Sequence, residues 1–166
     1  MASAGERPER LAGLPVVCTG LHSQLAPVCA GLGPGVRVAY VQVPGGALPV
    51  SLSDSVRELK ERGLLEVAIG AGSCFDGEVD CVSVAGALAW AAGNGAEAIV
   101  CSVGPGVVGT GSALGHGGVA AAEAANEATA LGGEPILTRA GALPPERIMG
   151  VVNAINPAGK AQRAVS

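Results

Sequence analysis

A glycine-dense loop follows a short apolar run, and its residue types point to the binding of an anion. The apolar run covers residues 98–103, and the loop reads Gly-Pro-Gly-Val-Val-Gly-Thr-Gly over residues 104–111. Glycine lacks a Cβ and tolerates positive φ, so successive backbone N–H groups can turn toward one ligand. We expect four glycines to admit a phosphate or carboxylate and a threonine to add a hydroxyl. These residues are Gly104, Gly106, Gly109, Gly111 and Thr110.

Two other interpretations of this loop were weighed. Its first three glycines match the letters of a dinucleotide-binding fingerprint, but further glycines up to Gly118 delay the following helix. No acidic residue ends the next strand, and no Gly-Lys-Ser/Thr follows, so neither a nicotinamide or flavin site nor a nucleotide-hydrolase loop is favoured. A tight turn that packs on neighbouring loops remains the plain alternative, and the sequence assigns no cofactor.

Four further residues carry groups that suit a small anionic ligand. His22 titrates near neutral pH and is the candidate for proton transfer, and Ser23 beside it offers a hydroxyl. Asp76 offers a carboxylate, and Arg139 a counter-charge. Each also has a structural interpretation, as a helix cap, a turn residue or the cover of a strand end. The two histidines are far apart and lack an acidic cluster, so no metal site is predicted.

The five cysteines, Cys18, Cys29, Cys74, Cys81 and Cys101, contain no C-x-x-C pair. Their odd number and their apolar surroundings favour buried, reduced thiols. Cys74 alone falls in an expected loop, so it is the candidate for a reactive thiol.

Strand and helix patterns alternate along the chain. Strands are expected at residues 14–19, 36–43, 65–69, 97–103 and 134–138. Helices are expected at residues 25–32, 53–62, 79–92, 118–131 and 144–156. This alternation requires parallel pairing through right-handed crossovers. It predicts the α/β class, as a three-layer Rossmann-like domain with a mostly parallel sheet of about five strands.

The expected domain covers residues 14–156, with a flexible N-terminus over 1–13 and a flexible tail over 157–166. Ligands of open parallel sheets bind at the carboxyl ends of the strands. The polar candidates all follow strands of the expected sheet. The sequence therefore predicts that His22, Asp76 and the glycine loop share one edge.

The composition limits the surface and its partners. Hydrophobic residues make up 49% of the 166 residues but aromatic residues only 2%, so the core consists of alanine, valine, leucine and isoleucine. Charged residues are 14%, against about 25% in typical soluble domains, which predicts that part of the surface is covered, in a homo-oligomer or against a missing domain. The net charge of −4 and the lack of a basic stripe argue against nucleic acid.

No membrane association is predicted either. Residues 98–122 carry no charged side chain, but their glycines, Pro105 and His116 are unsuited to a lipid-buried helix. Residues 1–13 are charged and lack the apolar core of a signal peptide. A cytoplasmic location is therefore expected.

Several ordered motifs resemble a bacterial family of uncharacterised proteins that is classed only as a domain of unknown function. They are the segments 18–27 (Cys-Thr-Gly-Leu-His-Ser-Gln-Leu-Ala-Pro), 38–41, 46–49, 57–59, 72–77 and 104–111. The resemblance runs from about Leu14 to Gly150. It implies an α/β domain and supplies no activity, so no catalytic residue is carried over.

Two departures from that family affect the expected function. Members are usually longer, with a β-rich segment ahead of this domain, and they tend to end in Gly-Val-Ser-His-His where this chain reads Gly-Val-Val-Asn-Ala over 150–154. The lost histidine pair favours binding over catalysis. The leading hypothesis is a domain that holds a small phosphate- or carboxylate-bearing ligand at the glycine loop, with catalysis left open. The alternative is a non-catalytic subunit or scaffold of an oligomeric assembly.

Overall fold

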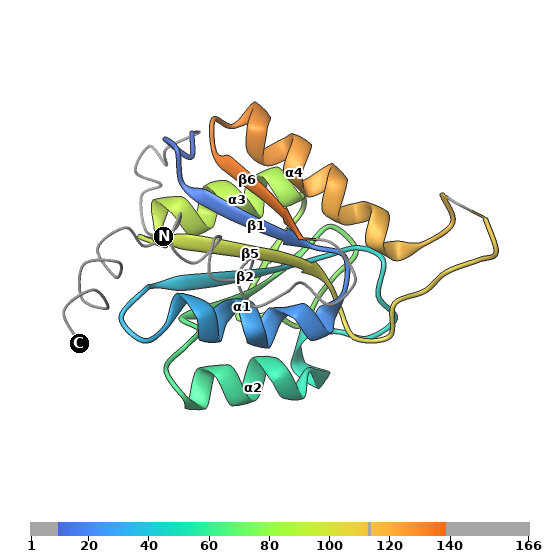
Figure 1. The fold of residues 1–166 in the computed structure, drawn as a ribbon, viewed down its shortest axis with the longest axis horizontal. Helices are drawn as coiled ribbons and strands as arrows, with labels where there is room; N and C mark the ends of the chain where they lie inside the picture. The colour runs from blue at the N-terminus through green and yellow to red at the C-terminus, as the bar shows by residue number, and fades with distance from the viewer. Residues whose placement is uncertain (1–9, 113, 139–166) are drawn as a thin grey trace, which may run out of the picture.

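A computed structural model describes residues 10–112 and 114–138. Its six strands form one sheet in the order β4-β3-β2-β5-β1-β6, and every pair of neighbours is parallel. The strands are β1 (Pro15–Thr19), β2 (Val38–Val43), β3 (Val67–Ala71), β4 (Val79–Cys81), β5 (Ala98–Val103) and β6 (Glu134–Thr138). The predicted α/β class is confirmed, because helices cover both faces of this sheet in a three-layer, Rossmann-like arrangement (Figure 1).

Each face of the sheet has its own pair of helices. Helices α1 (Leu25–Leu32) and α2 (Asp54–Glu61) pack on one face, and α3 (Val84–Gly93) and α4 (Ala120–Ala130) on the other. Strands β2 and β5 are buried along their whole length between these layers, which is why both read as nearly continuous apolar runs. Between a strand and the helix that follows it lie the short 3-10 helices η1 (His22–Gln24), η2 (Val50–Leu52) and η3 (Gly117–Val119).

Local chemistry sets the helix ends. The Ser53 hydroxyl accepts a hydrogen bond from the N–H of Val56 at 3.1 Å, which caps α2 as the sequence suggests. Helix α4 buries four alanines, Ala121, Ala124, Ala125 and Ala128, against the sheet. Their small side chains allow the helix to approach the sheet closely.

One expected element is wrong in its first part. Residues 79–81, predicted as the start of a helix, form the additional strand β4, which pairs with the outer side of β3 at Ile69 and Val79. The helix begins only at Val84, because the Ser83 hydroxyl accepts from the N–H of Gly86 at 3.0 Å and caps it there. The sheet therefore has six strands rather than about five.

Strand β6 closes the other edge of the sheet. The N–H of Glu134 donates to the carbonyl of Leu14 at 2.9 Å, so Glu134 turns its backbone groups toward the chain leading into β1. Successive residues of a strand alternate in direction, and Pro135 therefore turns its nitrogen toward the side of β6 that faces away from β1. Thr138 ends β6 beside Thr19 of β1.

Several sequence-based expectations lie outside the described residues. They are the N-terminal residues 1–9, Arg139, the helix expected at 144–156 and the tail at 157–166. Among the described helices, none has both the length and the apolar character needed to cross a bilayer.

Candidate functional site

The carboxyl end of β5 is the place where the chain changes sides. The chain leaves β1 toward α1 and β2 toward α2, whereas it leaves β5 toward α4 on the opposite face (Figure 1). Strand β5 lies between β1 and β2. Open α/β sheets bind ligands at such a switch point, so the loops after these three strands frame the candidate site.

Close backbone contacts at glycines hold these loops together. A Cβ on Gly45 would lie 2.7 Å from the carbonyl oxygen of Gly117, and a Cβ on Gly46 would lie 2.7 Å from that of Gly104. A Cβ on Gly104 would meet the side-chain amide nitrogen of Gln42 at 2.4 Å. Part of the glycine content therefore serves close packing between loops, which is the plain alternative that the sequence analysis kept open.

The second half of the glycine loop forms a hairpin that leaves the body of the protein. The N–H of Val108 donates to the carbonyl of Gly45 at 3.1 Å, and that of Gly117 donates to the carbonyl of Val108 at 2.8 Å. Figure 1 shows this segment, yellow to orange, extending beyond the sheet before it returns to α4. Gly104 and Gly106 lie at its base, and Gly109, Thr110 and Gly111 lie farther out.

An open groove of about 480 Å³ runs between this hairpin and the start of α4. Gly109, Thr110, His116 and Glu123 are among its lining residues. The N–H of Thr110 donates to the carbonyl of Gly115 and that of Gly117 to the carbonyl of Val108, so Gly109 pairs with His116 without hydrogen bonds and its own N–H points away from the strand that carries His116. The hydroxyl of Thr110 contacts that of Ser112 at 3.0 Å.

His116 adds a hydrogen-bond donor to the groove, although it is not among the predicted site residues. Its Nδ1 accepts a hydrogen bond from the N–H of Gly118 at 3.0 Å. The neutral imidazole therefore carries its proton on Nε2, which remains available as a donor. Because the ring is exposed and lines the groove, His116 belongs to the candidate site.

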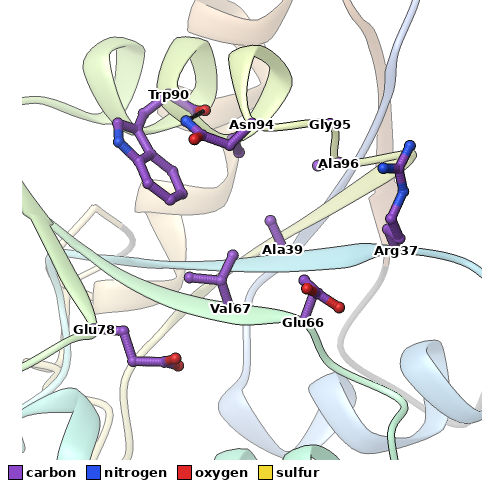
Figure 2. A pocket seen from close by; sticks show the side chains of 10 residues that line it. Arg37, Ala39, Glu66, Val67, Glu78, Trp90, Asn94, Gly95 and Ala96 are labelled. Atoms are coloured by element: carbon purple, nitrogen blue, oxygen red, sulfur yellow. Dashed lines mark hydrogen bonds between the residues drawn. The ribbon is translucent and has the colours of Figure 1, made fainter. Parts of the chain in front are cut away.

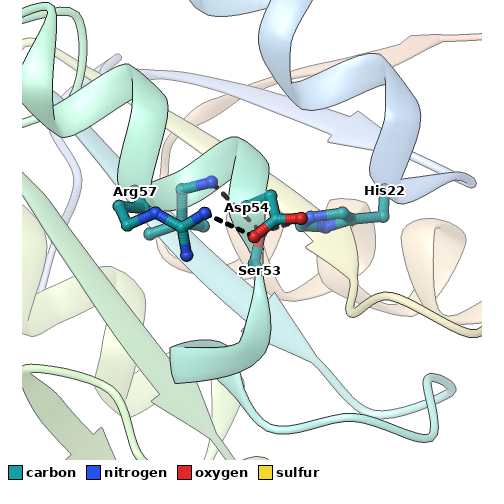
Figure 3. Close-up of polar contacts among 5 residues, drawn as sticks. His22, Ser53, Asp54 and Arg57 are labelled. Carbon is teal, nitrogen blue, oxygen red and sulfur yellow. Dashed lines mark hydrogen bonds and ion pairs between the residues drawn. The ribbon is translucent and has the colours of Figure 1, made fainter.

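A second cluster, deeper in the same edge, surrounds His22. Among the described residues the buried polar side chains are Thr19, Gln42, Ser53 and Ser102; the first two and Ser102 lie at or next to the carboxyl ends of β1, β2 and β5, and Ser53 caps α2. Figure 3 shows His22 reaching toward Ser53 at the start of α2, where Arg57 pairs with Asp54 at 2.6 Å. His22 Nε2 lies 2.7 Å from the Ser53 hydroxyl oxygen.

The hydrogen bonds around Tyr40 fix the tautomer of His22. The side-chain amide nitrogen of Gln42 donates to the carbonyl of Leu48 at 2.9 Å, so Gln42 Oε1 faces Tyr40 and can only accept. The Tyr40 hydroxyl therefore donates to Oε1, at 3.3 Å, and accepts from His22 Nδ1, at 3.2 Å. This leaves Nε2 of the neutral ring without a proton and turns it into the acceptor for the Ser53 hydroxyl.

Burial keeps this ring neutral. Loss of solvent lowers the pKa of His22 below its usual value, and the carbonyl of Val103, which accepts a hydrogen bond from the ring, partly opposes that shift. Burial also raises the pKa of Tyr40, so its hydroxyl stays protonated and keeps its role as donor. Both ring nitrogens of His22 therefore have hydrogen-bond partners, so this side chain links the loop after β1 to the loop after β2.

We expect stability to fall in mild acid because of His22. The unfolded chain binds a proton on this ring near pH 6.5 and the native state does so only at lower pH, so the stabilisation is complete above about pH 6.5 and is lost as the pH falls toward the native pKa. Urea unfolding between about pH 7.5 and about pH 5.5 measures this slope, which for one proton is at most about 1.4 kcal/mol per pH unit. The variant His22→Gln is expected to flatten it, and Thr129→Ala, which changes no titratable group, to preserve it. Equal slopes in the parent and His22→Gln would contradict the assignment.

The remaining predicted site residues do not converge on His22. Ser23 lies in η1 and is exposed. Asp76 is exposed in the loop after β3, where its carboxylate accepts a hydrogen bond from the Ser51 hydroxyl. Arg139 lies outside the described residues. The hydroxyl of Thr110 belongs to the projecting hairpin rather than to the cluster around His22.

The cysteines show little reactive character. None of the five forms a disulfide bond with another described residue, and Cys18, Cys29 and Cys101 are buried. Cys74 is half-buried, and burial raises the pKa of its thiol. The protonated thiol is a poor nucleophile at neutral pH. Within the part of the chain that the structure describes, no three histidine, cysteine, aspartate or glutamate side chains gather as a metal site would require.

Fold and site together define a three-layer α/β domain whose polar and glycine-rich loops meet at the carboxyl edge of a parallel sheet. The chain belongs to the family described as protein of unknown function (DUF3866), which matches residues 2–143. No curated protein and no solved structure matches the chain.

Proposed function

We propose that this protein binds a small anionic molecule in the groove between the 107–117 hairpin and α4. The observation that carries this proposal is the pair of side-chain donors on residues that line the groove: the hydroxyl of Thr110 and the Nε2–H of His116. A phosphate or carboxylate accepts several hydrogen bonds from such donors. The carboxylate of Glu123 at the helix side of the groove favours a ligand whose far end carries a hydroxyl or ammonium group.

In this proposal His22 lies deeper in the protein than the binding groove and serves in proton transfer. Its Nε2 can take the proton of Ser53, and the Tyr40 hydroxyl orients the ring. Ser53 is 3% exposed and caps α2, so a proton-transfer role requires the loop around Ser53 to open toward the ligand. The site geometry supports binding more directly than it supports a reaction.

The proposal is tested by thermal shift against nucleotides, sugar phosphates and small carboxylates, followed by calorimetry with each compound that raises the melting point. Thr110→Ala and His116→Gln are each expected to weaken binding about tenfold, because each removes a hydrogen bond to a charged group. Both positions are exposed, and circular dichroism checks that each variant keeps the fold. Thr129→Ala, which removes an exposed threonine on α4 outside the groove, is the matched control and is expected to bind like the parent. Unchanged binding in both groove variants would refute the proposal.

A second candidate is a non-catalytic subunit of a homo-oligomer in the cytoplasm. Six large apolar side chains are exposed on the loops of the carboxyl edge and on the hairpin: Leu48, Leu52, Phe75, Val108, Leu114 and Val119. Apolar surface of this kind favours a protein partner. Sedimentation velocity on the same preparations separates the two candidates, since a monomer that binds an anion supports the first alone.

A further inference from the structure

A separate cavity lies at the opposite edge of the sheet from the groove. Its volume is about 250 Å³, and it is bounded by Ala39 of β2, Val67 of β3 and the C-terminal part of α3 with Trp90 (Figure 2). Ala39 and Val67 stand at the amino ends of their strands. The cavity is therefore independent of the proposed anion site, which uses the carboxyl edge.

The cavity owes its space to small residues and to a short neighbouring strand. Ala39, Ala91 and Ala96 line it and leave room that larger side chains would fill. Strand β4 first pairs with β3 at Ile69, so Val67 at the start of β3 precedes that pairing. Trp90, the single tryptophan of the chain, forms a wall of the opening instead of filling the core.

Around the cavity, carboxylates outnumber the cations that pair with them. The guanidinium of Arg37 pairs with Glu97, with 3.6 Å between Nε and Oε2. Lys60 pairs with Glu78, whose Oε1 also accepts from the N–H of Ala68 at 3.1 Å. The Glu66 carboxylate, which also lines the cavity, makes no ion pair or hydrogen bond with another described residue. Both cations near the cavity are thus already matched, and a carboxylate is left over.

We propose that this cavity binds a small organic ammonium ion. The face of an indole ring attracts cations, and a nearby carboxylate without a partner adds to this attraction. Alkyl groups on the nitrogen would contact Ala39, Val67 and Ala96, which an inorganic cation could not do. An anion is disfavoured because Glu66 and Glu78 border the space while Arg37 is occupied by Glu97.

Trp90 makes the proposal directly measurable. Because the chain has one tryptophan, its fluorescence reports on the cavity alone. We titrate the full chain with tetramethylammonium chloride, with sodium chloride at the same ionic strength as reference. A saturable change in tryptophan fluorescence at millimolar concentrations is expected with tetramethylammonium and not with sodium. A linear response, or the same response to both salts, would overturn the proposal.

Two substitutions locate the binding. Glu66→Gln is expected to weaken tetramethylammonium binding about threefold or more, because the amide has the same shape without the charge. Glu61→Gln, at an exposed carboxylate of α2 outside the cavity, is the matched control and is expected to bind like the parent. Both positions are exposed, so the fold is retained. Equal affinity of Glu66→Gln and the parent would place the fluorescence change outside this cavity and overturn the assignment.

Discussion

Replacing Gly45 with alanine is expected to lower the free energy of unfolding by about 4 kcal/mol. Gly45 has a φ of +122°, a conformation that side-chain-bearing residues rarely adopt. Its new Cβ would also lie 2.7 Å from the carbonyl oxygen and 2.9 Å from the Cα of Gly117. Both obstacles are backbone atoms, so they cannot rotate away. Urea unfolding followed by circular dichroism measures the loss.

Two matched variants separate backbone strain from collision. Gly63 has a φ of +66°, and a Cβ there would lie in open space. We therefore expect Gly63→Ala to lower the free energy of unfolding by about 1 kcal/mol. A Cβ on Gly111 would also lie in open space, and its backbone lacks that strain. The free energy of unfolding of Gly111→Ala is expected to stay within about 0.5 kcal/mol of the parent. If Gly45→Ala cost no more than Gly63→Ala, the loops after β2 and β5 would not interlock as described.

Tyr40→Phe is expected to lower the free energy of unfolding by about 2 to 3 kcal/mol, although the ring volume is unchanged. The hydroxyl is the shared partner of His22 Nδ1 and Gln42 Oε1, and Ser102 also lies within 3.3 Å of it. Its removal leaves the buried Gln42 Oε1 without its donor and leaves His22 Nδ1 with only the Val103 carbonyl as acceptor. The ¹⁵N chemical shifts of His22 are expected to show the Nδ1–H tautomer in the parent and in the variant.

Ser102→Ala is the comparison for this variant. The Ser102 hydroxyl also contacts the carbonyl of Val103 at 3.0 Å and is not needed to orient His22, so we expect a loss of about 1 kcal/mol and an unchanged tautomer. A Tyr40→Phe protein as stable as the parent would show that the hydroxyl does not hold the cluster together.

Much of the architecture follows from sequence pattern, and the exceptions have physical causes. Strands β2 and β5 were predictable because strands buried on both faces read as apolar runs. Strand β4 was missed because three residues, with an aspartate at the centre, carry no strand pattern of their own. The pairing of Val79 with Ile69 makes them a strand, and that pairing is a property of the assembled sheet.

The candidate site was predictable only in part. His22 was found from its residue type, but Tyr40, Gln42 and Ser102 were read as members of apolar strands. A signal was present, since these polar side chains stand near the carboxyl ends of runs that are otherwise apolar. The direction of the hairpin that carries Thr110 could not be predicted, because it depends on contacts with Gly45 and Gly117.

The placement of Pro135 on β6 has a consequence for how copies of this protein can meet. A strand added on the side of β6 that faces away from β1 would find no amide proton at Pro135. Continuous hydrogen bonding along that side is therefore interrupted at this position. Exchange of Pro135 for valine would supply the amide proton.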